Sequence, residues 1–290
     1  MDEAPARRAD WYADPLGRHA LRFWDGTRWT ERVSSGGRLG TDAVDTELAE
    51  FLAIRGGDPR ARWPGWVAAV SVVVGLVAIV AAGAVARLAD GDGGSPLGSL
   101  AAGALTLYLS LLACCWAVRR ALGGTSRGMA FDFGFTFRPG DFAWGLVASL
   151  AARLGAVAVL LPLALADEDF VAPDAQGVEG IDPHLAVLVA FTIVALVAAP
   201  VVEELFFRGL LQRALENVVP VGLAIATGSV LFGFAHFSLA AGQANVGVVV
   251  ATGIGGAVFG VTAHVTRRIG LAVAGHAYFN LIPVLVVWTQ

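Results

Sequence analysis

Long apolar runs divide the chain into a polar N-terminal part and a hydrophobic remainder. Residues 1–62 mix charged, aromatic and small residues, whereas most later stretches are rich in Ala, Val, Leu and Gly. A helix needs about 20 apolar residues to cross the hydrocarbon core of a bilayer. Runs near this length cover 65–87, 97–118, 142–166, 185–206, 221–239, 245–264 and 269–289. The pattern therefore predicts an all-α polytopic membrane protein with about seven to eight transmembrane helices.

The polar part predicts a small β-rich module. Trp11, Trp24 and Trp29 lie close to Asp-Pro and Asp-Gly pairs, which are turn signals between short strands. The stretch that follows contains Ser-Ser-Gly-Gly and Gly-Gly, which are typical of a linker. The predicted parts are a small Trp-rich cytoplasmic module at 1–32, a linker at 33–62 and a transmembrane domain at 63–290.

Composition and charge agree with a membrane protein. Only 15% of the residues are charged and 56% are hydrophobic, whereas a soluble domain has about 25% charged residues. The basic residues are scattered among acidic ones, so we expect no nucleic-acid partner. Arginines gather in the loops before the first run, between the second and third, and before the seventh, while residues 167–182 are acidic without Lys or Arg. The positive-inside rule then predicts a cytoplasmic N-terminus and an outer C-terminus.

A few polar residues interrupt the apolar runs, where they are costly and usually functional. In the fourth run, Arg208 follows Glu204 by four residues, which is the spacing of an ion pair on one helix face. Glu203 then points about 100° away from Glu204. This predicts a structural Glu204–Arg208 pair and leaves Glu203 free for chemistry. The alternative is that both glutamates lie at the membrane interface.

Histidines in the fifth and seventh runs are the other polar residues that we consider as candidates for a functional site. With the turn between the fourth and fifth runs centred on residue 218, Glu203 lies 218 − 203 = 15 residues before it and His236 lies 236 − 218 = 18 after it. An antiparallel hairpin would place both within about one helical turn of the same depth, where they can share a water molecule. His276 and Asn280 are four residues apart and so share a helix face. The alternative for this pair is structural hydrogen bonding to another helix.

The ordered motifs Glu-Glu-x-x-x-Arg, Phe-x-x-x-His and His-x-x-x-Asn resemble the CPBP family of intramembrane proteases. This family contains CAAX prenyl endopeptidases and bacteriocin-processing or immunity (Abi) proteins. The resemblance covers about residues 185–287, the protease-like core, and the first three runs carry no signature. It implies a membrane-bound endopeptidase, and the residues that match the family motifs are Glu203, Glu204, Arg208, His236, His276 and Asn280.

The N-terminal pattern WYxDP…WDGxxWT resembles a small domain of unknown function that is attached to many bacterial membrane proteins. This resemblance implies no chemistry. It favours a multi-pass protein of the bacterial inner membrane, and the loop charges predict that the N-terminal module lies in the cytoplasm.

Water is the simplest nucleophile, because the chain has no G-x-S-x-G motif and no cysteine near a candidate histidine. We hypothesise that Glu203, aided by His236, is the general base. His276 and Asn280 would donate hydrogen bonds to the oxyanion, and Glu204 would orient the site through Arg208. This mechanism needs no cofactor. The alternative is a zinc ion, with Glu203, His236 and His276 as possible ligands.

Two other functions compete with proteolysis. One is a non-catalytic immunity or scaffold protein of the same fold, and the other is a proton-coupled transporter. The polar residues cluster toward one side of the membrane rather than along a pathway, which disfavours transport. The expected partners are the lipid bilayer and a peptide or protein substrate at the membrane.

Overall fold

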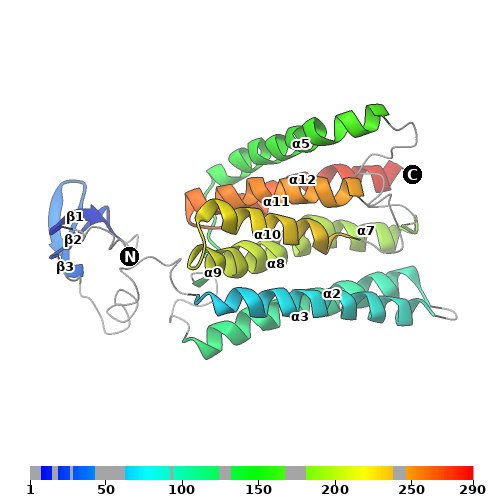
Figure 1. The fold of residues 1–290 in the computed structure, drawn as a ribbon, viewed down its shortest axis with the longest axis horizontal. Coiled ribbons are helices and arrows are strands. Elements are labelled where there is room, and N and C mark those ends of the chain that lie inside the picture. Colours follow the sequence, from blue (N-terminus) through cyan, green and yellow to red (C-terminus); the bar gives the residue numbers. More distant parts are fainter. Residues whose placement is uncertain are drawn as a thin grey trace. The chain divides into compact units, whose positions relative to one another are not determined.

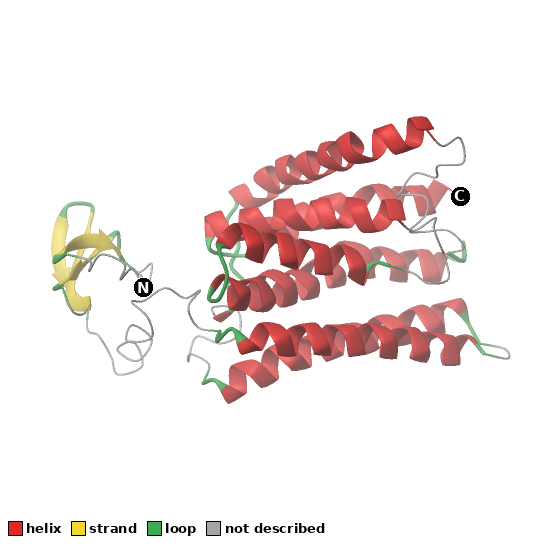
Figure 2. Ribbon diagram, in the orientation of Figure 1, coloured by secondary structure: helices red, strands yellow, loops and turns green. Residues whose placement is uncertain are grey.

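The computed structural model contains two compact units, Met1–Arg62 and Trp63–Gln290. The structure describes residues 8–14, 19–26, 29–42, 63–91, 94–123, 132–166, 181–237 and 246–289. Helices make up the second unit and a small sheet the first, as the red and yellow ribbons of Figure 2 show. The predicted fold class, a helical membrane domain with a small β-rich module, is confirmed.

The N-terminal sheet is longer than the sequence predicted. Its four antiparallel strands pair in chain order: β1 (Asp10–Ala13), β2 (Leu21–Trp24), β3 (Trp29–Ser35) and β4 (Arg38–Thr41). The module was expected to end at residue 32, with a linker from 33. Ser35 instead pairs with Arg38, and Gly36 and Gly37 form the two-residue loop between them with φ of 57° and 77°. Positive φ at both loop positions is the conformation of a tight hairpin turn, so these glycines continue the sheet.

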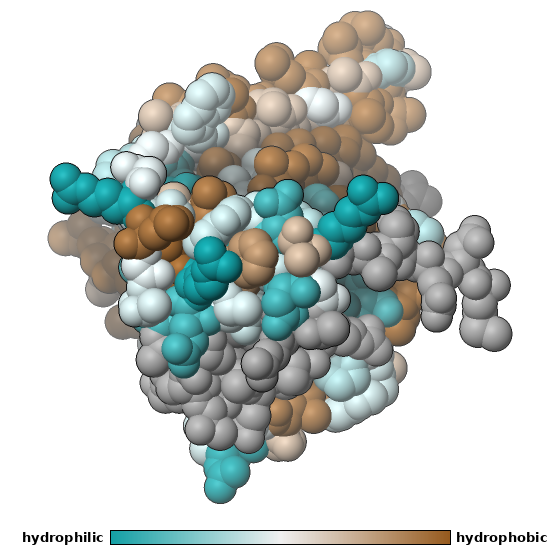
Figure 3. Space-filling model, turned by 90° about the vertical axis from the view of Figure 1, so that its left-hand side faces the viewer, coloured by the Kyte–Doolittle hydropathy of each residue, from teal (hydrophilic) through white to brown (hydrophobic). Residues whose placement is uncertain are grey.

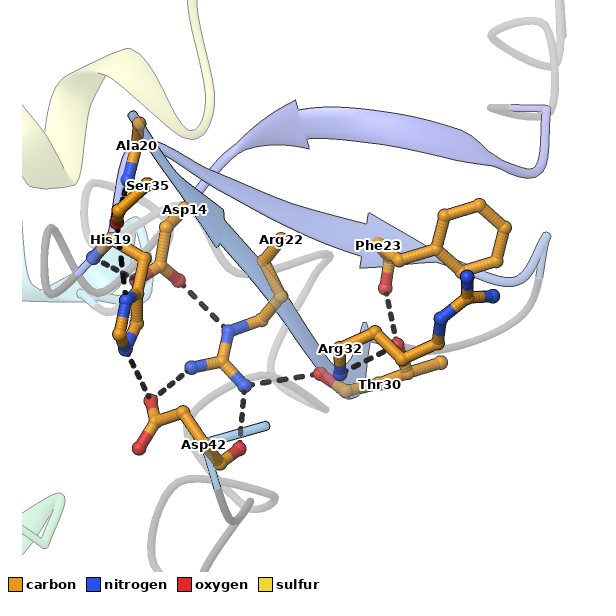
Figure 4. A network of polar contacts seen from close by, with 9 residues as sticks. All are labelled: Asp14, His19, Ala20, Arg22, Phe23, Thr30, Arg32, Ser35 and Asp42. Carbon is orange, nitrogen blue, oxygen red and sulfur yellow. Dashed lines mark hydrogen bonds and ion pairs between the residues drawn. The ribbon is translucent and has the colours of Figure 1, made fainter. Parts of the chain in front are cut away.

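Buried Arg22 holds this small sheet together. Figure 4 shows its guanidinium between the carboxylates of Asp14 and Asp42. Nε lies 2.9 Å from Asp14 Oδ1, and Nη1 donates to the carbonyl oxygen of Thr30 at 3.0 Å. Because Asp14 follows β1, Thr30 lies in β3 and Asp42 follows β4, one side chain joins the whole sheet. On β3, Arg32 covers the Phe23 ring, with Cζ 4.8 Å from its centroid.

Each of the seven predicted apolar runs forms a helix in the second unit. Among the described residues, six helical stretches are long and apolar enough to cross a membrane, while the fifth run forms a helix of only 15 residues. The elements are α2 (Trp66–Asp90), α3 (Pro96–Ala121), α5 (Gly140–Ala166), α7 (Leu185–Ile193), η3 (Val194–Ala198), α8 (Ala199–Glu204), η4 (Leu205–Gln212), α9 (Arg213–Glu216), α10 (Val221–Ala235), α11 (Val246–Thr266) and α12 (Gly270–Thr289). Among them, α7 to α9 are consecutive parts of one 32-residue helical stretch.

The helices lie side by side in a bundle. Figure 1 shows the α2–α3 hairpin on one side, α5 on the other, and α7 to α12 between them. Large apolar side chains such as Val80, Leu154 and Val265 are exposed, and brown hydrophobic atoms gather in the upper, more distant part of the view in Figure 3. Such a surface is expected where lipid replaces water, and it indicates a multi-pass membrane protein. Of the acidic loop used to predict orientation, residues 167–180 lie outside the described residues.

Polar contacts tie the helix ends together near the start of α2. Buried Arg213 donates to the carbonyl oxygens of Asp132, at 3.3 Å, and Arg267, at 3.0 Å. The Asp132 carboxylate pairs with Arg119 Nε at 2.6 Å. Arg267 itself has a positive φ of 59°, a strained backbone for a residue with a side chain. The bond from Arg213 therefore fixes the tight turn that leads from α11 into α12.

Close packing of α5 on α12 gives a testable prediction. A Cβ added at Gly145 would lie 2.8 Å from Ala274 Cβ and 2.9 Å from the backbone nitrogen of Gly275. We expect Gly145→Ala to destabilise the protein by about 1–3 kcal/mol, because these helices cannot separate without losing other contacts. Unfolding of the purified protein in detergent would measure the change.

Gly228→Ala is the matched control, since Gly228 is also helical but nothing lies within 4 Å of its added Cβ. This control should be neutral or slightly stabilising, because alanine has the higher helix propensity. Equal effects at both glycines would contradict a close contact between α5 and α12.

Candidate active site

The paired glutamates lie between two wide helical segments. Glu203 and Glu204 end α8, which is preceded by the π-helical η3 and followed by the π-helical η4. Pro200 lies just after η3. Its missing N–H and its ring prevent the regular hydrogen bond to the carbonyl four residues earlier, which favours a wider turn before it. π-helical segments occur frequently at functional sites.

Glu204 is completely buried and is held by two cationic or ionisable side chains. Its Oε1 accepts from Arg208 Nη1 at 2.8 Å and from His276 Nδ1 at 2.9 Å. The ion pair expected from the spacing is therefore formed. Arg208 also donates to the carbonyl oxygen of Gly256 at 3.0 Å, and its Cζ lies 4.3 Å from the centroid of the Phe232 ring. The pair connects α8 and η4 to α10, α11 and α12.

His276 lies between the two glutamates. While Nδ1 faces Glu204, Nε2 is 3.9 Å from Glu203 Oε2. Phe259 stacks on the imidazole with ring centroids 5.6 Å apart, and Phe232 approaches it edge-on at 5.5 Å. Because the Glu204 carboxylate can only accept, Nδ1 carries a proton. The aromatic rings and Glu204 thus fix the imidazole so that Nε2 points toward Glu203.

Glu203 is buried, and it contacts a tyrosine that the sequence analysis missed. Its Oε1 accepts from the Tyr108 hydroxyl on α3 at 3.4 Å. Within the described part of the chain, Oε2 has no hydrogen-bond partner, and the same holds for Oε2 of Glu204. Tyr108 could have been noticed as a hydroxyl-bearing side chain in an apolar run, but its distance of 95 residues from Glu203 left no local pattern.

His236 lies at the end of α10 and is only partly buried. Its Nδ1 donates to the carbonyl oxygen of Phe232 at 2.9 Å, so Nε2 is the nitrogen left for another partner. No hydrogen bond or ion pair among the described residues joins His236 to Glu203. The rings of Phe207 and Phe232 meet at 5.1 Å. Phe207 is four residues after Glu203 and Phe232 is four before His236, so the contact agrees with a common depth for the glutamate and the histidine.

Asn280 binds the backbone of the same long helical stretch. Its Nδ2 donates to the carbonyl oxygen of Ala195 in η3 at 2.8 Å. This is a structural hydrogen bond to another helix, the alternative considered for this residue. An amide nitrogen has a second N–H, which this bond leaves available.

The described residues do not bring three metal-binding side chains together. No group of three or more His, Cys, Asp or Glu side chains among them is arranged to hold a metal ion. Of the possible zinc ligands, Glu203 and His276 face each other, and the bond from Nδ1 of His236 to its own helix leaves Nε2 of that ring as the only nitrogen that could reach a metal ion. A catalytic zinc usually has three protein ligands, and the described residues show two of the three proposed ligands, Glu203 and His276, side by side. The zinc alternative stays a prediction.

The site lies in a segment of the chain that matches the model of a known protein family. Residues 185–282 match the family model described as type II CAAX prenyl endopeptidase Rce1-like. This segment is similar to Rce1-like proteins. The resemblance to CAAX prenyl endopeptidases read from the motifs is confirmed, and the match supports an intramembrane CAAX-type protease fold. The narrower expectation of an Abi protein stays a prediction.

The Rce1-like segment contains all six residues that the motifs singled out. The other matched segment, residues 9–38, corresponds to a family of unknown function, DUF2510, as the N-terminal pattern predicted. Neither the curated proteins nor the solved structures contain a match to the chain.

Arg208 compensates a buried charge, which predicts a large effect on stability. Arg208→Met should destabilise the protein by about 3–5 kcal/mol, because it removes the cation that faces the fully buried Glu204. Combining it with Glu204→Gln should recover part of the loss, since the uncompensated charge is then absent. Unfolding in detergent would measure both variants.

Arg120→Met is the control, because Arg120 is exposed at the end of α3; its effect should stay within about 0.5 kcal/mol. An Arg208→Met variant as stable as this control would contradict a buried, compensated pair.

Proposed function

We propose that the protein is an intramembrane endopeptidase that hydrolyses peptide bonds of a membrane-associated protein or peptide. The observation that supports this most is the buried series Arg208–Glu204–His276–Glu203 in the Rce1-like segment. Among the residues that the structure describes, each glutamate has one oxygen without a hydrogen-bond partner. Buried polar atoms are normally satisfied, and the exceptions often belong to catalytic sites.

In this proposal, Glu203 is the general base that takes a proton from the attacking water. Its free Oε2 is the oxygen nearest His276, so a water molecule there would face both groups. His236 assists from the same depth through its Nε2. The water oxygen adds to the peptide carbonyl, and the proton held by Glu203 passes to the leaving amine. The C–N bond then breaks, and the products are a carboxylic acid and an amine, which exchange a proton to give a carboxylate and an ammonium group.

His276 and Asn280 are the proposed donors to the oxyanion. Nδ1 of His276 already donates to Glu204, so Nε2 can donate only when the ring carries both protons. Glu204 and Arg208 would therefore act through His276 and position it. Asn280 would use the N–H that is not bound to Ala195. A donor to an oxyanion contributes about 3–4 kcal/mol to the transition state in a soluble protease.

We further propose that the site opens to the cytoplasmic half of a bacterial inner membrane. Arg213 and Arg267 join at the end of the bundle where α12 begins, and His276 lies six residues into that helix. The six residues correspond to about 9 Å of helix. Basic residues mark the cytoplasmic side, so this arrangement favours a cytoplasmic N-terminus and a site near that face.

Loss of the base should abolish cleavage. Glu203→Gln keeps the size of the side chain but removes its ability to take a proton, and His236→Ala removes its assistant. In liposomes, we expect no cleavage with the first variant and at least a 100-fold loss with the second, in line with general acid–base catalysis. The probe is a pool of lipid-anchored, internally quenched peptides, with cut sites identified by mass spectrometry.

Glu216→Gln is the matched control, because Glu216 ends the same helical stretch but binds Gln212 and His264 instead. It should cleave as the wild type does. Full activity of Glu203→Gln would exclude Glu203 as the base. A wild type that cleaves no peptide would refute the endopeptidase, and solute flux without cleavage would indicate a transporter.

Activity should not depend on zinc in the proposed glutamate mechanism. Incubation with a strong chelator, followed by dialysis, should leave peptide cleavage within twofold of the untreated enzyme. Metal analysis of the active preparation should find far less than one zinc per chain. Stoichiometric zinc, with activity lost on chelation and restored by zinc alone, would instead establish the zinc alternative.

A further inference from the structure

We propose that Tyr108 is a positioning residue for Glu203, and that α3 is thereby part of the active site. This inference rests on the proposed function, since it assigns a role to a neighbour of the proposed base. The Tyr108 hydroxyl fixes one carboxylate oxygen, and the other oxygen is then directed toward His276.

The two oxygens of Glu203 have different surroundings. Oε1 accepts from Tyr108 at 3.4 Å, whereas Oε2 faces His276 Nε2 at 3.9 Å and has no hydrogen-bond partner in the described ranges of the chain. The last torsion of a glutamate is broad, with no sharp staggered minima. A donor on one oxygen restricts this rotation, so the oxygen without a partner stays on the His276 side.

The Tyr108 hydroxyl differs from the other hydroxyls of its helix. Thr106 and Ser110 each donate to a carbonyl oxygen of α3 four residues earlier, at 2.7 Å. The tyrosine hydroxyl, at the far end of its ring, reaches across to α8 instead. The ring packs against the hydrophobic core, and phenylalanine could do the same. Tyr108 is partly buried, and removing a hydroxyl from water costs free energy unless it is hydrogen-bonded, so the Glu203 carboxylate explains why a tyrosine lies here.

The contact between the Tyr108 hydroxyl and Glu203 Oε1 is longer than most hydrogen bonds of its kind. Hydroxyl–oxygen hydrogen bonds usually measure about 2.5–3.0 Å, and 3.4 Å is longer. Catalytic hydrogen bonds often tighten in the Michaelis complex, so we expect this contact to shorten when a substrate binds. Tyr108 also lies outside residues 185–282, so it is a contribution of the N-terminal helices to the Rce1-like segment.

Kinetics of Tyr108→Phe test the role in catalysis. We expect kcat to fall about 10-fold with KM within twofold, because a hydrogen bond to a charged group is lost while the ring remains. The full-length protein in liposomes would be measured with the peptide of the quenched, lipid-anchored pool that the wild type cleaves fastest. Ser110→Ala, which removes a hydroxyl from the same helix, should leave both constants unchanged. An unchanged kcat in Tyr108→Phe, or a loss confined to KM, would overturn the proposal.

A stability cycle tests the contact without requiring activity. Tyr108→Phe should lower the melting temperature by about 2–4 °C in the wild type, the shift expected for one hydrogen bond in a protein of this size. In a Glu203→Leu background, where the acceptor is gone, the same change should have almost no effect. Equal shifts in both backgrounds would exclude the contact. A wild type without cleavage but with this coupling would refute the proposed function and leave the contact in place.

Discussion

The buried carboxylate of Glu204 is the constraint on which the centre of the bundle depends. Within a bilayer, a charge of this kind has no water to face, and it persists only with compensating partners. Arg208 supplies the opposite charge from the next helical turn, and His276 adds a second donor from α12. Arg208 is held in turn by the carbonyl oxygen of Gly256 and by the face of Phe232. Stability and the orientation of the proposed catalytic groups therefore depend on the same contacts.

Glu203 and Glu204 are neighbours in sequence, but their surroundings give them different roles. Glu204 is saturated on one oxygen by two strong donors, whereas Glu203 has only a long contact to Tyr108 and a distant imidazole. A helix turns about 100° per residue, so adjacent side chains meet different helices. In this way α8 carries a structural carboxylate, Glu204, and a proposed reactive carboxylate, Glu203, at nearly the same depth.

Local features of the chain were predictable, and contacts between distant segments were less so. The apolar runs define the helices, and the four-residue spacing predicts the Glu204–Arg208 pair, because both follow from the geometry of one helix. The contact of His276 with Glu204 depends on how two helices are rotated against each other, which no single run encodes. The contact of Tyr108 with Glu203 was not predictable for the same reason, because it joins two different helices. The hairpin at Gly36 and Gly37 was misjudged because a glycine pair fits a flexible linker and a tight turn equally well.

The wide segments η3 and η4 have a consequence for how this chain can vary. A π-helical segment accommodates an extra residue relative to α-helix, so the direction of every later side chain depends on it. Deleting one residue within Leu205–Gln212 would turn Arg213 and Asn217 away from their partners while Glu203 and Glu204 stayed in place. The number of residues in η4 therefore sets the direction in which the side chains between the glutamates and the basic end of the bundle point. Its length in residues is constrained even where the identity of each residue is not.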